Sequence, residues 1–171
     1  MRVMGIDPGS AITGYGVVEA RGARLCHIDS GAIRVPKAET GDDIGARLWF
    51  ISDKIRQAIQ RNQPDSIAIE KVFIARNARS ALVLGQARGA ALVACGELCG
   101  SIREYSALQV KQAVVGRGRA DKTQVQHMVR VLLALGAAPQ ADIADALACA
   151  ICHINHSRSR SRYAEAAGAS P

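Results

Sequence analysis

The order of apolar patterns along the chain is the feature that most constrains its fold. Three strand-like runs, RVMGID, TGYGVVEA and ARLCHIDSGAI, come first, with glycine and aspartate turn signals between them. Apolar residues at helical spacing then cover residues 42–62, and a buried strand, SIAIE, follows directly. A second helix, the strand SIREY and three more helices are predicted over residues 78–99, 101–105, 108–115, 122–135 and 141–155. This order predicts an α/β fold that begins with a meander of three antiparallel strands.

The first and fourth predicted strands each end in a carboxylate, Asp7 and Glu70. A strand that is followed by a helix and another strand usually returns parallel through a right-handed crossover, so the strand ending at Glu70 can lie beside the strand ending at Asp7. Ligands of open α/β sheets gather outside the carboxyl ends of the strands. Both acids are therefore expected at one edge of a mixed five-stranded sheet flanked by helices.

Two further carboxylates, Asp142 and Asp145, begin the helical run in PQADIADALACAICH. Residues three apart share a helix face at about 5–6 Å, so this pair can join the acids at the sheet edge. A structural role stays open for each acid taken singly. Acids in a first helical turn offset the helix dipole, Asp142 can be an N-cap, and Asp7 precedes a Pro-Gly turn.

Four converging carboxylates predict a divalent metal, because two unit charges about 4 Å apart repel by roughly 4 kcal/mol at an effective dielectric near 20. Oxygen ligands favour magnesium or manganese, and such ions can activate water for phosphodiester hydrolysis. The chain carries 22 Lys and Arg against 15 Asp and Glu, a net charge of +7. This excess indicates a polyanionic partner, nucleic acid before a membrane surface. Acids within a basic chain therefore suggest a nuclease.

Length and cysteine content add three expectations. A chain of 171 residues has the size of one compact domain. Five cysteines, an odd number, and no export signal indicate reduced thiols and a cytoplasmic location. The sequence CAICH matches the haem-attachment pattern, with His156 as a possible zinc ligand, but buried core thiols are the favoured interpretation. No membrane span is expected, because Gln86 and Arg88 interrupt the longest apolar run.

Four long motifs resemble the RuvC family of Holliday-junction resolvases, which have a ribonuclease-H-like fold. They are MGIDPGSAITGYGVV, IAIEKVFIARNARSALVLGQARGA, QVKQAVVGRGRADKTQVQHMV and PQADIADALACAI, and the resemblance covers residues 1–156. It implies that Asp7, Glu70, Asp142 and Asp145 are the catalytic, metal-binding acids. It also implies Mg²⁺, with Mn²⁺ as a substitute, at one or two ions per site. The implied activity is paired symmetric nicking of four-way DNA junctions by a homodimer in recombination and repair, through metal-activated water and with a branch-migration helicase complex as partner.

The resemblance also assigns DNA-contacting residues. Phe73 matches an aromatic that stacks on unpaired junction bases, with an anchor of its loop on the core as the less favoured alternative. Lys111 and Lys122 match catalytic lysines near the scissile phosphate, although a solvated basic face is the alternative. Five arginines are candidate phosphate contacts: Arg76, Arg79, Arg88, Arg117 and Arg119.

Two segments lie outside these assignments. The helix predicted over residues 78–99 is apolar or small on more than one face, which predicts that one face packs on the sheet and another on a two-fold partner. Residues 157–171 alternate Ser with Arg and lose apolar periodicity, so a flexible basic tail is expected after a nuclease domain over residues 1–156.

Two rival functions stay open. The segment GIDPGSAITGYG is similar to the phosphate loop of actin-like kinases and ATPases, in which Gly9, Gly14 and Gly16 would let backbone amides approach a phosphate. The other rival is a protein that binds junctions without cleaving them.

Overall fold

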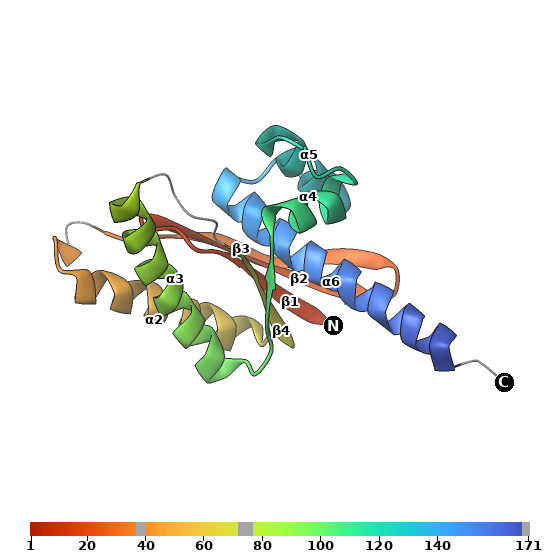
Figure 1. Ribbon diagram of the computed structural model, residues 1–171, viewed down its shortest axis with the longest axis horizontal. Coiled ribbons are helices and arrows are strands. Elements are labelled where there is room, and N and C mark those ends of the chain that lie inside the picture. The colour runs from red at the N-terminus through yellow and green to blue at the C-terminus, as the bar shows by residue number, and fades with distance from the viewer. Residues whose placement is uncertain (37–39, 72–76, 169–171) are drawn as a thin grey trace.

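The computed structural model describes residues 1–36, 40–71 and 77–168, with only the course of the helix given for residues 162–168. A five-stranded sheet with the order β3-β2-β1-β4-β5 lies at its centre (Figure 1). Strands β1 (Arg2–Asp7), β2 (Ile12–Arg21) and β3 (Arg24–Arg34) form the antiparallel meander. Strands β4 (Ser66–Glu70) and β5 (Ile102–Tyr105) continue the sheet in parallel to β1. The predicted mixed sheet is confirmed.

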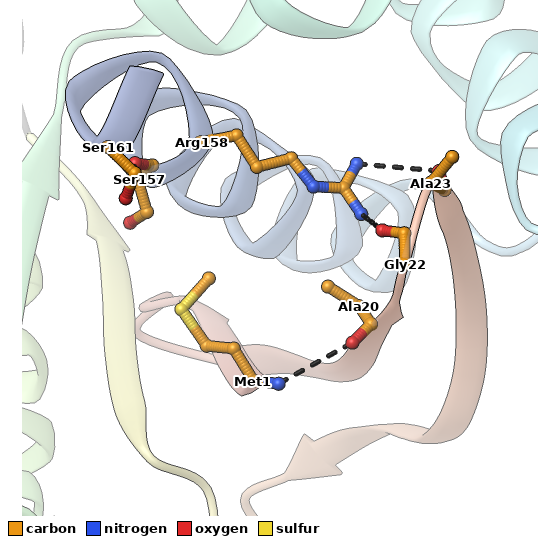
Figure 2. A pocket seen from close by; sticks show the side chains of 7 residues that line it. All are labelled: Met1, Ala20, Gly22, Ala23, Ser157, Arg158 and Ser161. Atoms are coloured by element: carbon orange, nitrogen blue, oxygen red, sulfur yellow. Dashed lines mark hydrogen bonds between the residues drawn. The ribbon is translucent and has the colours of Figure 1, made fainter. Parts of the chain in front are cut away.

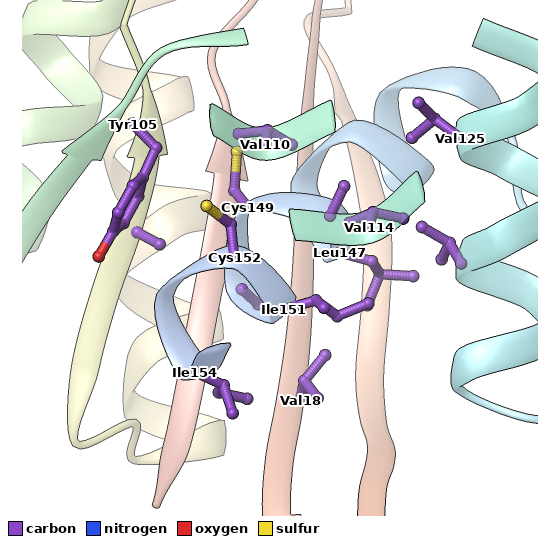
Figure 3. Close-up of a cluster of buried hydrophobic side chains, with 14 of the residues drawn as sticks. Val18, Tyr105, Val110, Val114, Val125, Leu147, Cys149, Ile151, Cys152 and Ile154 are labelled. Carbon is purple, nitrogen blue, oxygen red and sulfur yellow. The ribbon is translucent and has the colours of Figure 1, made fainter. Parts of the chain in front are cut away.

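In the part of the chain that the structure describes, two helices cover one face of the sheet and three cover the other (Figure 1). Helices α2 (Ile44–Asn62) and α3 (Ala78–Leu98) pack on the first face, where Met4, Ile6 and Ile69 join the core. Helices α4 (Ala107–Val115), α5 (Lys122–Leu132) and α6 (Ala141–Gly168) pack on the second. Figure 3 shows Leu147 and Ile151 of α6 between the sheet and α4 in that second core.

Helix α6 lies directly against the sheet because three glycines leave room for it. A Cβ atom at Gly5 would lie 1.8 Å from the Ala146 carbonyl oxygen, and one at Gly14 would lie 2.0 Å from the Asp142 carbonyl oxygen. At Gly16 it would lie 2.5 Å from the Leu147 side chain. Any side chain at these positions would push α6 away, so the glycines of β1 and β2 set the distance between the sheet and this helix.

Helix α6 is longer than the sequence predicts. It was expected to end near residue 155 and to be followed by a flexible tail, but it continues to Gly168, so that boundary is wrong. The guanidinium of Arg158 donates to the Gly22 carbonyl at 2.6 Å and the Ala23 carbonyl at 3.5 Å (Figure 2). These bonds hold the extension on the β2–β3 turn, and Arg and Ala are good helix formers that need no apolar periodicity.

The two cysteines of CAICH belong to the core, as the favoured interpretation predicts. All five are free thiols, and Cys149 and Cys152 of α6 are fully buried among the apolar side chains of the second core. Figure 3 shows both sulfurs near Val110 and Tyr105. The hydroxyl group of Tyr105 lies 2.8 Å from Nδ1 of His153, so this histidine is engaged within the protein.

Candidate active site

The ends of β1 and β4 place Asp7 and Glu70 on the same face of the sheet. Side chains along a strand alternate between faces, and Ile6 and Ile69 are directly paired residues that both belong to the core under α2 and α3. The next residue on each strand, Asp7 or Glu70, therefore lies on the opposite face, under α6. The predicted meeting of these two acids at one sheet edge is confirmed.

Helix α6 brings the other two acids to this edge. Asp142 is the second residue of the helix, so it is not the N-cap, and its backbone rests on Gly14. Asp145, one turn later, lines a cavity of about 450 Å³ together with Asp7 and Glu70. Asp142 does not line this cavity, but its charge acts on both Asp7 and Asp145.

The two lysines predicted for the site, Lys111 and Lys122, line the same cavity, each on a helix that begins with a capping box. Ser106 and Gln109 form a capping box that begins α4, which carries Lys111. Asp121 and Gln124 form the box that begins α5, whose first residue is Lys122. Local sequence signals thus fix where these helices begin, and the packing of α4 and α5 brings both predicted lysines to the cavity of the acids.

The electrostatics confirm that the four carboxylates interact. Burial, followed by the charges of Asp145, Glu70 and Asp142, raises the pKa of Asp7 to about 7, and Lys122 acts in the opposite direction. Burial also raises the pKa of Glu70, with Asp145 acting in the same direction and Lys111 and Lys122 against it. The pKa of Asp145 is raised by burial and by Asp142. The site therefore holds negative charge that the two lysines only partly offset.

The carboxylate oxygens of the four acids suit a hard divalent cation, but the protein side chains do not complete its coordination shell by themselves. Across residues 1–36, 40–71 and 77–168, no three His, Cys, Asp or Glu side chains lie close enough to hold an ion by themselves. Magnesium usually binds through one or two carboxylates and completes its shell with water and substrate phosphate oxygens. Oxygen-only donors with raised pKa values are what such an ion would stabilise, so metal binding by the four acids stays a prediction that the site chemistry supports.

The other predicted DNA contacts have different outcomes. Phe73 and Arg76 lie outside the described residues. Arg79 is exposed in the first turn of α3, and Arg117 and Arg119 are exposed between α4 and α5, so their phosphate contacts stay predictions. Arg88 instead forms an ion pair with Glu104, and its side chain is only 15% exposed, so its predicted role as a phosphate contact is not supported.

Lys71 and Leu84 are among the residues of this cavity that were not predicted from the sequence. The signal for Lys71 was its position directly after Glu70, whereas no pattern marked Leu84 among the many apolar residues of α3. The glycines proposed for a phosphate loop serve other purposes, because Gly14 and Gly16 are covered by α6. This contact argues against the kinase-like alternative.

The raised pKa of Asp7 predicts how stability depends on pH without metal. This carboxyl titrates at 3.8 when unfolded and at about 7 when folded, so the folded chain binds an extra proton in that interval. Stability from this proton is complete below the unfolded pKa and is lost as pH rises through about 7. In EDTA, Tm should therefore fall over this range more steeply for the parent than for Asp7→Asn. Parallel Tm curves, measured by circular dichroism, would contradict the assignment.

Comparison with known proteins agrees with this geometry. The family model described as crossover junction endodeoxyribonuclease RuvC matches residues 3–153. A curated RuvC from Shewanella loihica is 54% identical over 153 residues, which are 90% of this chain and 86% of the relative. Another from Pelobacter propionicus is 55% identical over 155 residues, 91% of this chain and 86% of the relative.

Solved structures agree as well. Thermus thermophilus RuvC in complex with a Holliday junction substrate superposes with a TM-score of 0.85 at 35% identity, covering 93% of this chain and 96% of that one. The predicted ribonuclease-H-like fold is thereby confirmed. Since the family model spans most of the sequence and curated members are more than half identical to it, the chain belongs to the RuvC family of crossover junction endodeoxyribonucleases.

Proposed function

We propose that this protein resolves four-way DNA junctions by paired symmetric nicks during homologous recombination and DNA repair. The observation that carries the proposal is a cavity lined by three carboxylates and by Lys111 and Lys122, with the charge of a fourth acid, Asp142, acting on two of these carboxylates, in a chain with a net charge of +7. The junction bound to the Thermus thermophilus relative supports the same substrate class here. The rival that binds without cleaving lacks support, because all the expected acids are present.

Each part of the cavity has a proposed task. Asp7, Glu70, Asp142 and Asp145 would hold Mg²⁺, or Mn²⁺ in its place, at one or two ions per site. When bound, the ion supplies Lewis acidity for water-driven hydrolysis of the phosphodiester. Lys111 and Lys122 already oppose the charge of the acids, and beside a bound phosphate they would stabilise the negative charge that develops during cleavage.

The proposal is tested with an end-labelled four-way junction and a linear duplex of the same sequences in Mg²⁺. Symmetric nicks in the junction alone are expected. A junction that is bound but stays intact in both Mg²⁺ and Mn²⁺ would favour the noncatalytic alternative.

We also propose a homodimer formed through α3. This helix is long and apolar enough to span a membrane, but Ala87, Ala91 and Ala94 are buried against the sheet layer, where no lipid would reach them. Its outer face remains apolar, with Leu82 and Val93 exposed by 63% and 58%. A two-fold partner would cover this face and give two sites for the two opposed strands of a junction.

Replacing Val93 by Glu should convert the dimer into a monomer. The side chain is exposed within the chain, so folding should tolerate the change, whereas a charge buried between two copies should not be tolerated. Light scattering should give twice the 18.1 kDa chain mass for the parent and the single mass for Val93→Glu. Gln60→Glu, at an exposed position of α2, is the matched control and should remain dimeric. A monomeric parent, with and without junction DNA, would refute the dimer.

Three broader expectations complete the proposal. The free thiols support a reducing, cytoplasmic location, which cell fractionation would test.

A branch-migration helicase complex is the proposed partner. If this protein and the helicase complex did not co-purify on junction DNA, that result would count against the partnership. The nuclease domain is proposed to end near residue 156, so a chain cut after that residue should still cleave junctions.

A further inference from the structure

The active-site cavity is lined by residues from helices on both faces of the sheet, Leu84 of α3 from one face and Lys111 and Lys122 of α4 and α5 from the other. Ala68 packs in the core under α6, whereas Ile67 and Ile69 pack in the core under α3. Glu70 shares the face of Ala68, and alternation then places Lys71 on the face of Ile69. The Lys71 N–H donates to the Tyr105 carbonyl at 2.7 Å, so the extended pairing of β4 with β5 continues through this residue.

Helix α3 supplies an apolar part of the cavity wall. Leu84 lines the cavity together with Lys71, and it belongs to neither buried core cluster. Its side chain is only partly buried. An apolar side chain that faces a cavity and does not contribute to a core is available to contact an apolar part of a ligand.

The ammonium group of Lys71 is not paired with the carboxylates of the site. Lys111 and Lys122 both lower the pKa of Glu70, although Lys71 is its immediate neighbour in sequence and has no such effect. Among the described residues, Lys71 forms no salt bridge, and its side chain is exposed. Its ammonium group is therefore free to neutralise a second anion at a distance from the carboxylates.

We propose that Lys71 and Leu84 form a subsite for the nucleotide next to the scissile phosphate. Lys71 binds the flanking phosphate, and Leu84 contacts the apolar face of the attached nucleoside. A DNA strand whose scissile phosphate lies at the acids presents both groups one nucleotide away, on the α3 side of the cavity. The inference rests on the proposed function, because it requires DNA as the substrate, and it adds two substrate-positioning residues to that function.

The phosphate contact of Lys71 is tested by the salt dependence of junction binding in the Asp7→Asn protein, which is expected to bind the junction without cleaving it. One lost phosphate contact lowers the slope of log K against log salt by about 0.7 for single-stranded DNA to about 0.9 for a duplex. Lys71→Ala should show this decrease, and Lys71→Arg should restore the slope. Lys54→Ala removes an exposed charge from α2 and should leave the slope unchanged. A slope that Lys71→Ala does not change would overturn the phosphate contact.

The contact of Leu84 with the nucleoside is tested by Leu84→Ala in the Asp7→Asn protein. Loss of the nucleoside contact should weaken junction binding by about tenfold with no change in salt slope, whereas Leu98→Ala, near the far end of α3, should bind like the parent. Equal affinities for Leu84→Ala and the parent would overturn this contact. If the Asp7→Asn protein failed to bind junctions at all, the proposed function itself would fail, so the two failures are distinguishable.

Discussion

Replacing Asp7 by Asn is expected to abolish junction cleavage while junction binding is retained. Asp7 is the acid on which the other three carboxylates all act, so its oxygens lie at the centre of the charge cluster. Even groups that only orient a metal's ligands contribute about 10- to 100-fold, so loss of this carboxylate should lower the cleavage rate by more than about a hundredfold. Binding should persist, because removing a negative charge cannot weaken attraction to phosphate.

The measurement is single-turnover nicking of a labelled junction in Mg²⁺, beside a gel-shift titration of the same junction in EDTA. Asp42→Asn is the matched control, since Asp42 is exposed and is not among the groups that shift the pKa of Asp7. The control should cleave like the parent. Equal cleavage by Asp7→Asn and the parent would show that the four acids are not the catalytic group.

Replacing Gly5 by Ala should have the largest effect on stability. The added Cβ would lie 1.8 Å from the Ala146 carbonyl oxygen and 2.8 Å from the Ala150 backbone nitrogen, and neither backbone atom can move unless α6 moves. Overpacking of this kind costs about 3 kcal/mol. For a chain of 171 residues this corresponds to a decrease in Tm of about 6–12 °C. Cleavage should also fall, because displacing α6 from β1 separates Asp145 from Asp7.

Thermal unfolding at neutral pH measures the first effect, and junction nicking well below Tm measures the second. Gly136→Ala is the control, because a Cβ there meets no described atom within 4 Å and its φ is not in the left-handed region. It should differ little from the parent. A Gly5→Ala protein with unchanged Tm would show that α6 does not need this close contact with the sheet.

Local patterns predicted most of the secondary structure but not where every element ends. Helical spacing located α2 and α4 to within two residues, since apolar faces and capping residues are encoded nearby in sequence. The end of α6 was mispredicted, because its last turns depend on Arg158 binding the β2–β3 turn, which is distant in sequence. The ion pair of Arg88 was not predicted for the same reason, since Glu104 lies on another element.

The sequence by itself determined the order of strands and helices and identified the four acids, because periodicity, crossover handedness and motif spacing are properties of the chain. Only the tertiary structure decided how these acids act. Three glycines let α6 approach the sheet, and burial together with the charges of the other three acids raises the pKa of Asp7 to about 7. The tertiary structure also placed Lys71 and Leu84 at the opposite side of the same cavity. Burial, repulsion and cavity shape depend on distances between elements, and packing alone sets those distances.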